Sequence, residues 1–274
     1  MSYDQILYGL IKYSARIYSK IQRSFPSVLP ANPLLTTNSK SSLVTKSLMN
    51  VKIHAHMDGF EPLIKNELNF FLENQKELES IQTVKEIGNI LKLVKNTESI
   101  PGDILELGIA KGGTTITIAH FLKNINSNRN IFGCDSFEGL PYEDKFSDKA
   151  SEKVSGMYCN SFEVVSNNVK KFKTDDKITL IKGLFEDTLY EKLDDKKFSF
   201  VFLDCDLYDA TKYCLEFVWP RLSQNGIIVF DDYGGGARDL KKGKWGETKA
   251  VDEFCTGKKI KIQLDPEPMI IKNE

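Results

Sequence analysis

The chain has 274 residues, of which 41% are hydrophobic and 27% charged, and its formal net charge is −1 at pH 7. This composition is that of a globular protein, and it excludes collagen-like, disulfide-framework and fully disordered classes. The near-neutral charge argues against a nucleic-acid binder. No apolar run of about 18 residues predicts a transmembrane helix.

Positive charge gathers at the N-terminus, where the first 50 residues hold six Lys or Arg and one Asp. Residues 3–24 combine apolar residues at helical spacing with a basic stripe, so they predict a basic amphipathic helix. Such a helix fits packing on its own domain or on a second subunit, peripheral contact with an anionic membrane surface, or disorder. Residues 26–50 are rich in Pro, Ser, Thr and Asn, which predicts a linker.

Three regions follow from these patterns: residues 1–50 as helix and linker, residues 51–100 as a helical or lid segment, and residues 101–274 as the main domain, which is expected to carry the functional site. Helices are expected over 59–74 and 76–96. The five cysteines form no CxxC pair and are odd in number, which favours free thiols in a reducing cytoplasm. The N-terminus lacks the pattern of a secretion signal.

From residue 101 apolar strands alternate with helices, which predicts a parallel sheet covered on both faces, an α/β Rossmann-like fold. A terminal hairpin is expected over 259–273, turning at Asp265-Pro266. In such sheets ligands bind beyond the carboxyl ends of the strands. The expected strands are 103–109, 130–137, 177–183, 198–206 and 226–232, and the expected helices are 114–125, 161–172, 209–222 and 247–255.

The first motif is ILELGIAKGGTT, in which a strand ends at Glu106 and a glycine-containing loop leads into a helix that begins with Thr114. Glycines allow a tight turn and close approach of a ligand to the backbone. The loop is not a P-loop, and its spacing fails the dinucleotide pattern because Ala110 stands where the second glycine is required. A plain strand-to-helix turn remains the alternative.

The next two motifs follow the second and third strands. Asp135, in FGCDSFEGLP, ends its strand about 30 residues after Glu106 and suits hydrogen bonds from both ribose hydroxyls of a nucleoside, with helix capping as the alternative. In IKGLFEDT, residues 183–187 should lie beside the same crevice, where an adenine could rest on Leu184 or Phe185, unless these two residues are core.

Two further strands end in pairs of acids: Asp204 and Asp206 in FSFVFLDCD, and Asp231 and Asp232 in GIIVFDD. Two carboxylates about 4 Å apart repel by roughly 4 kcal/mol at an effective dielectric constant near 20. Several acids this close require a cation or protonation, and oxygen ligands favour Mg²⁺, Ca²⁺ or Mn²⁺. Capping roles for Asp206 and Asp232 remain open.

Five motifs in this order, ELGIAKGG, DSFEGLP, GLFEDTL, LDCDLYDAT and VFDDY, resemble the macrocin-type O-methyltransferases over about residues 55–255. The resemblance implies a class I methyltransferase fold with a seven-stranded sheet, parallel except in a C-terminal hairpin. It also implies S-adenosylmethionine and Mg²⁺ as cofactors, a sugar or glycosylated metabolite as acceptor, and a homo-oligomer. Two positions depart from the family pattern: Cys205 replaces a glycine and Leu184 an aromatic residue.

The resemblance also implies roles for residues. Asp204 is the expected catalytic base, and Asp204, Asp231 and Asp232 are the expected metal ligands. Asp135 and Ser136 would take the ribose of the cofactor. The remaining expected cofactor-binding residues are Glu106, Gly108, Gly112, Gly113, Thr114, Gly183, Phe185 and Glu186.

Three functions remain open at this point: methylation of a sugar hydroxyl, methylation of a catechol-like phenol by the same metal chemistry, and a catalytically silent fold that binds or assembles. An NAD-dependent oxidoreductase is disfavoured by the failed glycine spacing. The long polar segment 142–161 and the glycine- and lysine-containing segment 234–249 are expected to flank the acceptor as lid and wall.

Overall fold

The computed structural model describes residues 57–144, 146, 155–234 and 246–273. The chain divides into two compact units, Met1–His56 and Met57–Glu274. The predicted basic helix and linker therefore lie outside the described residues, as do residues 145 and 147–154 of the expected lid and residues 235–245 of the expected wall. None of the described helices in the second unit has the length and apolar character of a membrane span.

The second unit opens with three helices: α3 (Pro62–Glu73), α4 (Gln75–Leu78) and α5 (Val84–Asn96). The single helix expected over 76–96 is therefore wrong. Glu79 adopts a left-handed conformation that ends α4, and α5 starts afresh at Thr83, whose side chain forms a capping box with Glu86. The intervening loop, residues 79–83, becomes part of the site described below.

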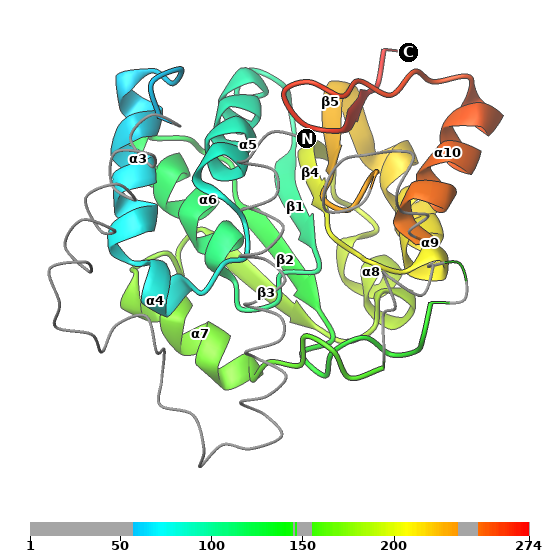
Figure 1. Cartoon of the computed structure of the whole chain (residues 1–274), viewed down its shortest axis with the longest axis horizontal. Helices are drawn as coiled ribbons and strands as arrows, with labels where there is room; N and C mark the ends of the chain where they lie inside the picture. The colour runs from blue at the N-terminus through cyan, green and yellow to red at the C-terminus, as the bar shows by residue number, and fades with distance from the viewer. Residues whose placement is uncertain (1–56, 145, 147–154, 235–245, 274) are drawn as a thin grey trace, which may run out of the picture. The chain divides into compact units, whose positions relative to one another are not determined.

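A six-stranded sheet forms the centre of the unit, in the order β3-β2-β1-β4-β5-β6 (Figure 1). Neighbouring strands are parallel, except that β6 is antiparallel to β5. The strand order reverses between β1 and β4, so these two strands form the switch point of a doubly wound sheet. The strands are β1 (Asp103–Leu107), β2 (Ile131–Asp135), β3 (Ile178–Lys182), β4 (Phe198–Leu203), β5 (Leu222–Phe230) and β6 (Met269–Ile271).

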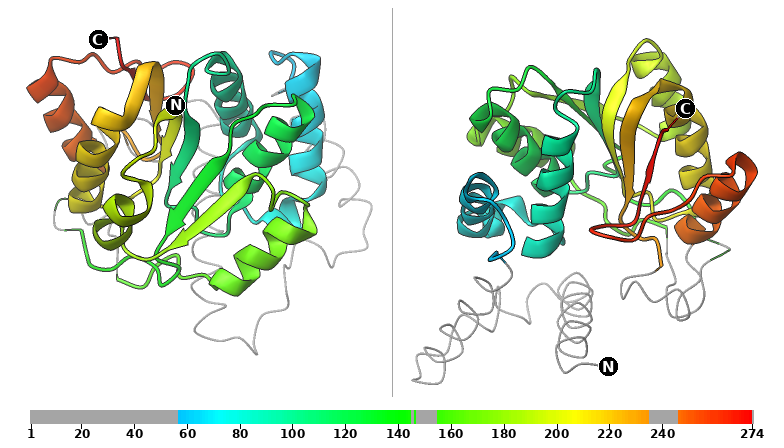
Figure 2. Two further views of the ribbon diagram at one scale, coloured as in Figure 1. Left: turned by 180° about the vertical axis from the view of Figure 1, so that it is seen from behind. Right: turned by 90° about the horizontal axis from the view of Figure 1, so that it is seen from above.

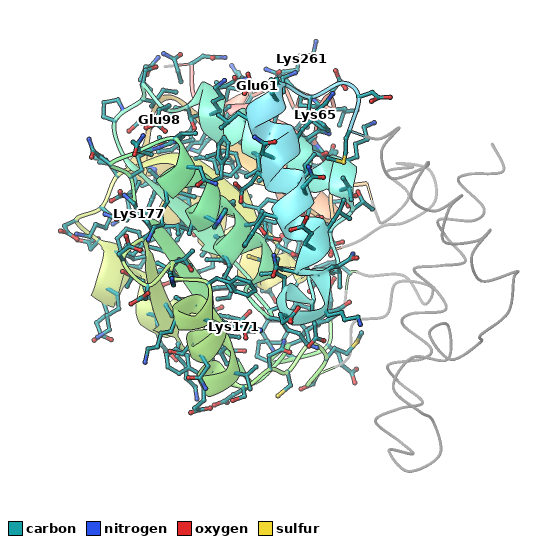
Figure 3. The ribbon with its side chains drawn as sticks, turned by 90° about the vertical axis from the view of Figure 1, so that its left-hand side faces the viewer. Glu61, Lys65, Glu98, Lys171, Lys177 and Lys261 are labelled. Carbon is teal, nitrogen blue, oxygen red and sulfur yellow. The ribbon has the colours of Figure 1, made fainter. Side chains whose placement is uncertain are left out.

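Helices cover both faces of the sheet, which confirms the predicted α/β class (Figure 2). One face carries α5, α6 and α7, with α3 packed outside α5 and α6. Figure 3 looks onto this side, where the labelled Lys171 lies on α7 and Glu61 at the start of α3. The other face carries α8, α9 and α10. The bounds not yet given are α6 (Gly113–Asn124), α7 (Phe162–Lys171), α8 (Phe185–Leu193), α9 (Tyr208–Arg221) and α10 (Gly246–Lys258).

The core explains why β1 and β4 read as continuous apolar runs. Four of the five residues of β1 and all six of β4 are buried, because helices lie on both faces of these central strands. Phe198, Phe200 and Phe202 are among the largest fully buried side chains. The central strands therefore hold their carboxyl ends in fixed positions.

The C-terminal hairpin and seventh strand of the family pattern are not confirmed. Among the described residues, antiparallel pairing is limited to β6 on β5 and an isolated bridge between Gln263 and Met269. The segment before this bridge alternates lysines with Ile260 and Ile262, and its lysines are exposed. Residues 259–265 thus pack as an irregular edge segment with two half-buried isoleucines rather than as a full strand.

Candidate active site

The carboxyl ends of β1 and β4 touch at the centre of the site. The Asp204 amide donates to the carbonyl of Leu107 at 2.9 Å, which places Asp204 directly beside the start of the glycine loop. Gly108 follows Leu107 with φ of +87°, and a side chain there would overlap the carbonyl oxygen of Asp204. Glycine is required at 108 by this contact as well as by its backbone conformation.

The other two glycines of the loop also make close contacts within the chain. A Cβ at Gly112 would lie 2.9 Å from Cγ1 of Val165, and one at Gly113 would lie 2.6 Å from the carbonyl of Leu78. The sequence suggested that these glycines make room for a ligand, whereas in the described structure they make room for α7 and for the end of α4. The loop is therefore clamped between three elements before any ligand binds.

Glu106 is a buried acid at the end of β1, only 2% exposed. Its Oε2 accepts a hydrogen bond from Oγ1 of Thr115 at 2.6 Å. Burial raises the pKa of Glu106 from 4.5 to about 8; the Thr115 hydrogen bond opposes this rise, and the charges of Asp135 and Asp231 add to it. Thr114, the neighbouring predicted cofactor residue, lies within 3.3 Å of the Ser80 hydroxyl instead.

Asp135 ends β2 and is held by two backbone amides. Its Oδ2 accepts from the amide of Ala110 in the glycine loop at 2.8 Å, and its Oδ1 accepts from the amide of Phe137 at 2.7 Å. Burial raises the pKa of Asp135, although these hydrogen bonds lower it. The Ser136 hydroxyl donates to the carbonyl of Gly139 at 2.8 Å and so shapes the following turn. No helix begins directly after Asp135, so the capping alternative is wrong.

The residues after β3 lie beside Asp135, because the Gly183 amide donates to the Asp135 carbonyl at 3.0 Å. Leu184 is exposed and precedes the first turn of α8. Phe185 packs against the main core, and the carbonyl of Glu186 accepts from the Tyr213 hydroxyl. Of the two residues considered for adenine stacking, Leu184 is exposed and Phe185 is partly buried.

An acidic cluster follows β4 and β5. Carboxylate oxygens of Asp204, Asp206 and Asp232 all lie within 4.8 Å of one another. Burial, and after it the charges of Asp231, Asp206 and Asp232, raise the pKa of Asp204 well above its ordinary value. The structure thus brings together two of the three expected metal ligands, Asp204 and Asp232, and adds Asp206.

Asp206 has an unusual backbone for a buried residue. Its φ is +61°, in the left-handed region that non-glycine residues seldom adopt, and it is only 8% exposed. Such conformations concentrate at functional sites. The preceding Cys205, which departs from the family pattern, faces the core and lies 3.7 Å from the sulfur of Cys214.

Asp231, the third expected metal ligand, makes a contact that the sequence did not predict. Its Oδ1 accepts a hydrogen bond from Nε2 of Gln82 at 2.9 Å. Gln82 belongs to the loop between α4 and α5 and is only 6% exposed. The interpretation of residues 76–96 as one helix concealed this role, because it left no loop at Gln82 that could reach the site.

Glu247, in the first turn of α10, is a second residue that sequence reasoning missed. It is fully buried, and its Oε1 accepts from the Asp232 amide at 2.9 Å. Burial and then the charges of Asp232, Asp231 and Asp206 raise its pKa well above the ordinary value. In the sequence an acid at the start of a helix indicates only a favourable helix-dipole position, so nothing signalled its burial.

A doubly wound sheet with a glycine loop and acids at its carboxyl edge defines the class I methyltransferase fold. Among solved structures, the O-methyltransferase NovP matches with a TM-score of 0.60 and 23% identity over 71% of this chain and 82% of that chain. The calicheamicin methyltransferase CalS11 matches with a TM-score of 0.57 and 18% identity over 90% of this chain and all of that chain.

The particular family follows from residues 78–265, which match the model described as Macrocin-O-methyltransferase (TylF). This match covers more than half of the chain, so the chain belongs to this family of S-adenosylmethionine-dependent O-methyltransferases.

Individual relatives are similar at 28–29% identity. A tetracenomycin rhamnosyl 4'-O-methyltransferase from Streptomyces olivaceus is 29% identical over 62% of this chain and 70% of its own length. Demethyldecarbamoylnovobiocin O-methyltransferase from Streptomyces niveus is 28% identical over 55% of this chain. Mycinamicin III 3''-O-methyltransferase from Micromonospora griseorubida is also 28% identical over 55% of this chain. The chain spans 60% and 63% of the length of the last two.

Proposed function

We propose that this protein is a divalent-cation-dependent O-methyltransferase that transfers a methyl group from S-adenosylmethionine to a hydroxyl of a sugar or glycosylated metabolite. One observation carries the proposal: three carboxylates from the ends of β4 and β5 lie within 4.8 Å of one another, next to the glycine loop. Family membership supplies the methyl donor, and the acids supply the reason for a cation.

The donor set fits a hard cation. Asp204, Asp206 and Asp232 offer only oxygen ligands, which Mg²⁺, Ca²⁺ and Mn²⁺ prefer. Asp206 and Asp232 are buried, and Asp204 is partly exposed, so one side of the cluster is open to an acceptor. Acids this close repel one another, and a bound cation would remove that repulsion. Asp231, which Gln82 holds, adds negative charge beside this set.

Different residues along the carboxyl edge of the sheet would hold different parts of the cofactor. Glu106, the loop from Gly108 to Gly113 and Thr114 would hold the methionine part of the cofactor. Asp135 and Ser136 would hold its ribose. The adenine side would be formed by Gly183, Phe185 and Glu186, together with the exposed Leu184.

Asp204 would serve as the general base. It lies beside both the glycine loop and the other acids, so it can reach an acceptor hydroxyl placed between them. A cation held by these carboxylates would supply positive charge that makes a sugar hydroxyl more acidic, and S-adenosylmethionine would supply the methyl group. The chain must then hold the acceptor oxygen about 3–3.5 Å from the methyl carbon and in line with its bond to sulfur.

The acceptor class rests on the relatives. The names of two of them place methylation on a rhamnosyl-bearing tetracenomycin and on mycinamicin III. A sugar hydroxyl is barely acidic, so it needs the charge stabilisation that the acidic cluster could organise with a cation. The names of the relatives therefore support a glycosylated acceptor, and the acidic cluster supplies a chemical reason for it.

Calorimetric titration tests this function without knowledge of the acceptor. S-adenosylmethionine and Mg²⁺ would be titrated into the wild type and into the double variant Asp204→Asn/Asp232→Asn. We expect both proteins to bind the cofactor and only the wild type to bind Mg²⁺. The matched control is Asp176→Asn, which removes an exposed carboxylate paired with Lys123 and should bind both ligands normally.

Two outcomes would count against the proposal. Absence of cofactor binding in the wild type would favour a silent member of the fold. Cofactor binding together with unchanged Mg²⁺ binding in the double variant would show that the cation binds elsewhere. After a positive result, a screen of glycosylated and catechol acceptors would decide between sugar and phenol methylation.

A further inference from the structure

Glu247 is a buried carboxylate that the proposed mechanism does not use. Its side chain has no exposed surface, and it comes from α10, an element remote in sequence from β4. One oxygen, Oε1, accepts from the Asp232 amide, whereas Oε2 is buried without a hydrogen-bond partner in the described part of the chain. A buried acceptor without a donor costs about 1–3 kcal/mol, and more if it is charged.

A purely structural role would explain the position of Oε1 but not the second carboxylate oxygen, Oε2. Oε1 ties the amide of Asp232 to the start of α10, and the hydroxyl of Thr248 supports the same joint by accepting from the Gly234 amide at 2.9 Å. A glutamine at 247 would make the same bond to Asp232 without a negative charge. The glutamate instead places a second, ionisable carboxylate oxygen next to Asp232, from whose amide its other oxygen already accepts.

We propose, on the basis of the proposed function, that Glu247 is a further carboxylate of the cation site. Oε1 positions the main chain of Asp232, and Oε2 contributes the negative charge that favours a bound divalent cation. Unpaired buried polar atoms in native structures commonly mark an ion or a catalytic role. The three grouped aspartates and Glu247 then form one electrostatic unit, drawn from β4, β5 and α10.

The test is the affinity of the full-length protein for Mn²⁺, measured by electron paramagnetic resonance of the free ion in the absence of cofactor. Glu247→Gln keeps an oxygen for the Asp232 amide and removes only the charge. We expect its dissociation constant to rise 10- to 100-fold, as for residues that support metal ligands. The matched control is Glu253→Gln on the same helix, where the carboxylate is exposed and pairs with Lys249 and Tyr208; its affinity should not change.

The outcomes separate this inference from the proposed function. No Mn²⁺ binding by the wild type would overturn the cation-dependent function itself. Wild-type binding that Glu247→Gln retains in full would overturn only the role of Glu247. If Glu247→Gln does not fold, Glu247→Asp replaces it, because the aspartate keeps the charge but withdraws it from the site. Several-fold weaker binding supports the role, and wild-type affinity overturns it.

Discussion

Charged side chains are buried at both ends of the parallel strands, but in different environments. The amino edge is the side of the sheet where the strands begin, and the carboxyl edge is the side where they end. At the amino edge, before β2, Arg129 is only 7% exposed and both terminal nitrogens are engaged. Nη1 donates to Thr97 and to the Ser199 hydroxyl at 3.0 Å, and Nη2 donates to the carbonyl of Val94 at 2.8 Å and to Glu98 at 2.5 Å. The chain thus supplies partners for both terminal nitrogens of the guanidinium, and only its Nε is buried without a partner among the described residues.

At the carboxyl edge the buried acids Asp204 and Glu247 have other carboxylates as charged neighbours. The charges that raise the pKa of Asp204 all come from other carboxylates, and one oxygen of Glu247 is buried without a donor among the described residues. A buried charge with its own partners indicates structure, whereas buried like charges indicate a ligand. The kind of neighbour that each buried charge has therefore indicates the functional site more specifically than burial does.

The largest expected effect is on the free energy of unfolding, and it concerns Glu106 in the protein without cofactor or cation. Its pKa in the folded protein is about 8, above its ordinary 4.5, so the folded state binds the proton more tightly. The stability contributed by the proton is therefore complete below about pH 4.5 and is lost as pH rises through about 8. Glu106→Gln should remove this loss of stability, which is about 5 kcal/mol from the size of the pKa shift.

Urea unfolding of wild type and Glu106→Gln at several pH values, without cofactor or cation, measures this difference. The free energies of the two proteins should diverge between pH 5 and pH 8, with the variant the more stable at pH 8. Glu73→Gln, at an exposed position on α3, is the control and should follow the wild type. Parallel curves for Glu106→Gln would show that Glu106 is ionised without cost.

The second effect is at the amino edge. Arg129→Met leaves the hydroxyls of Thr97 and Ser199 without their donor, and Glu98 without its ion pair, so the free energy of unfolding should fall by about 3 kcal/mol. Mn²⁺ affinity should not change, because the residue lies at the opposite edge of the sheet. Lys85→Met, an exposed substitution on α5, is the control for loss of charge. An Arg129→Met protein that keeps the stability of the wild type but binds Mn²⁺ more weakly would contradict the separation of structural and functional charges between the two edges.

The smallest effect sharpens the description of the site. Gln82→Leu removes the donor to Asp231 and leaves that carboxylate with one hydrogen bond fewer, which we expect to weaken Mn²⁺ binding about five-fold, or roughly 1 kcal/mol. Gln82→Met, which keeps a side chain of similar length without a donor or a charge, should weaken binding to the same extent. If both variants bind Mn²⁺ like the wild type, the Gln82 contact does not position Asp231.

Much of the fold was predictable because the central strand β4 is almost entirely apolar and because α5 and α7 begin after the capping residues Thr83 and Ser161. The expected strand over 103–109 ends two residues early, since Gly108 turns into the left-handed region. A local signal in the sequence could have shown that residues 76–96 are not one continuous helix. The pair Thr83 and Glu86 is a capping box, and it marks a new helix start inside the apolar periodicity.

The site was predictable only where it follows strand ends. Asp204, Asp135 and Glu106 were found because parallel strands bring their carboxyl ends to one edge. The contacts of Gln82 and Glu247 are tertiary, and they join segments 149 and 15 residues away from Asp231 and Asp232. No local pattern encodes such contacts, so a sequence can indicate the acids but not the side chains that orient them.

The contact between Gly108 and the Asp204 carbonyl has a consequence for enzyme engineering. The loop assigned to the methyl donor and the strand end assigned to the acceptor share one backbone junction with no room for a side chain. Any substitution at 108 would displace both at once. Libraries designed to change the acceptor would therefore keep this position fixed and vary the exposed rim, where Ile81 and Leu184 project into solvent.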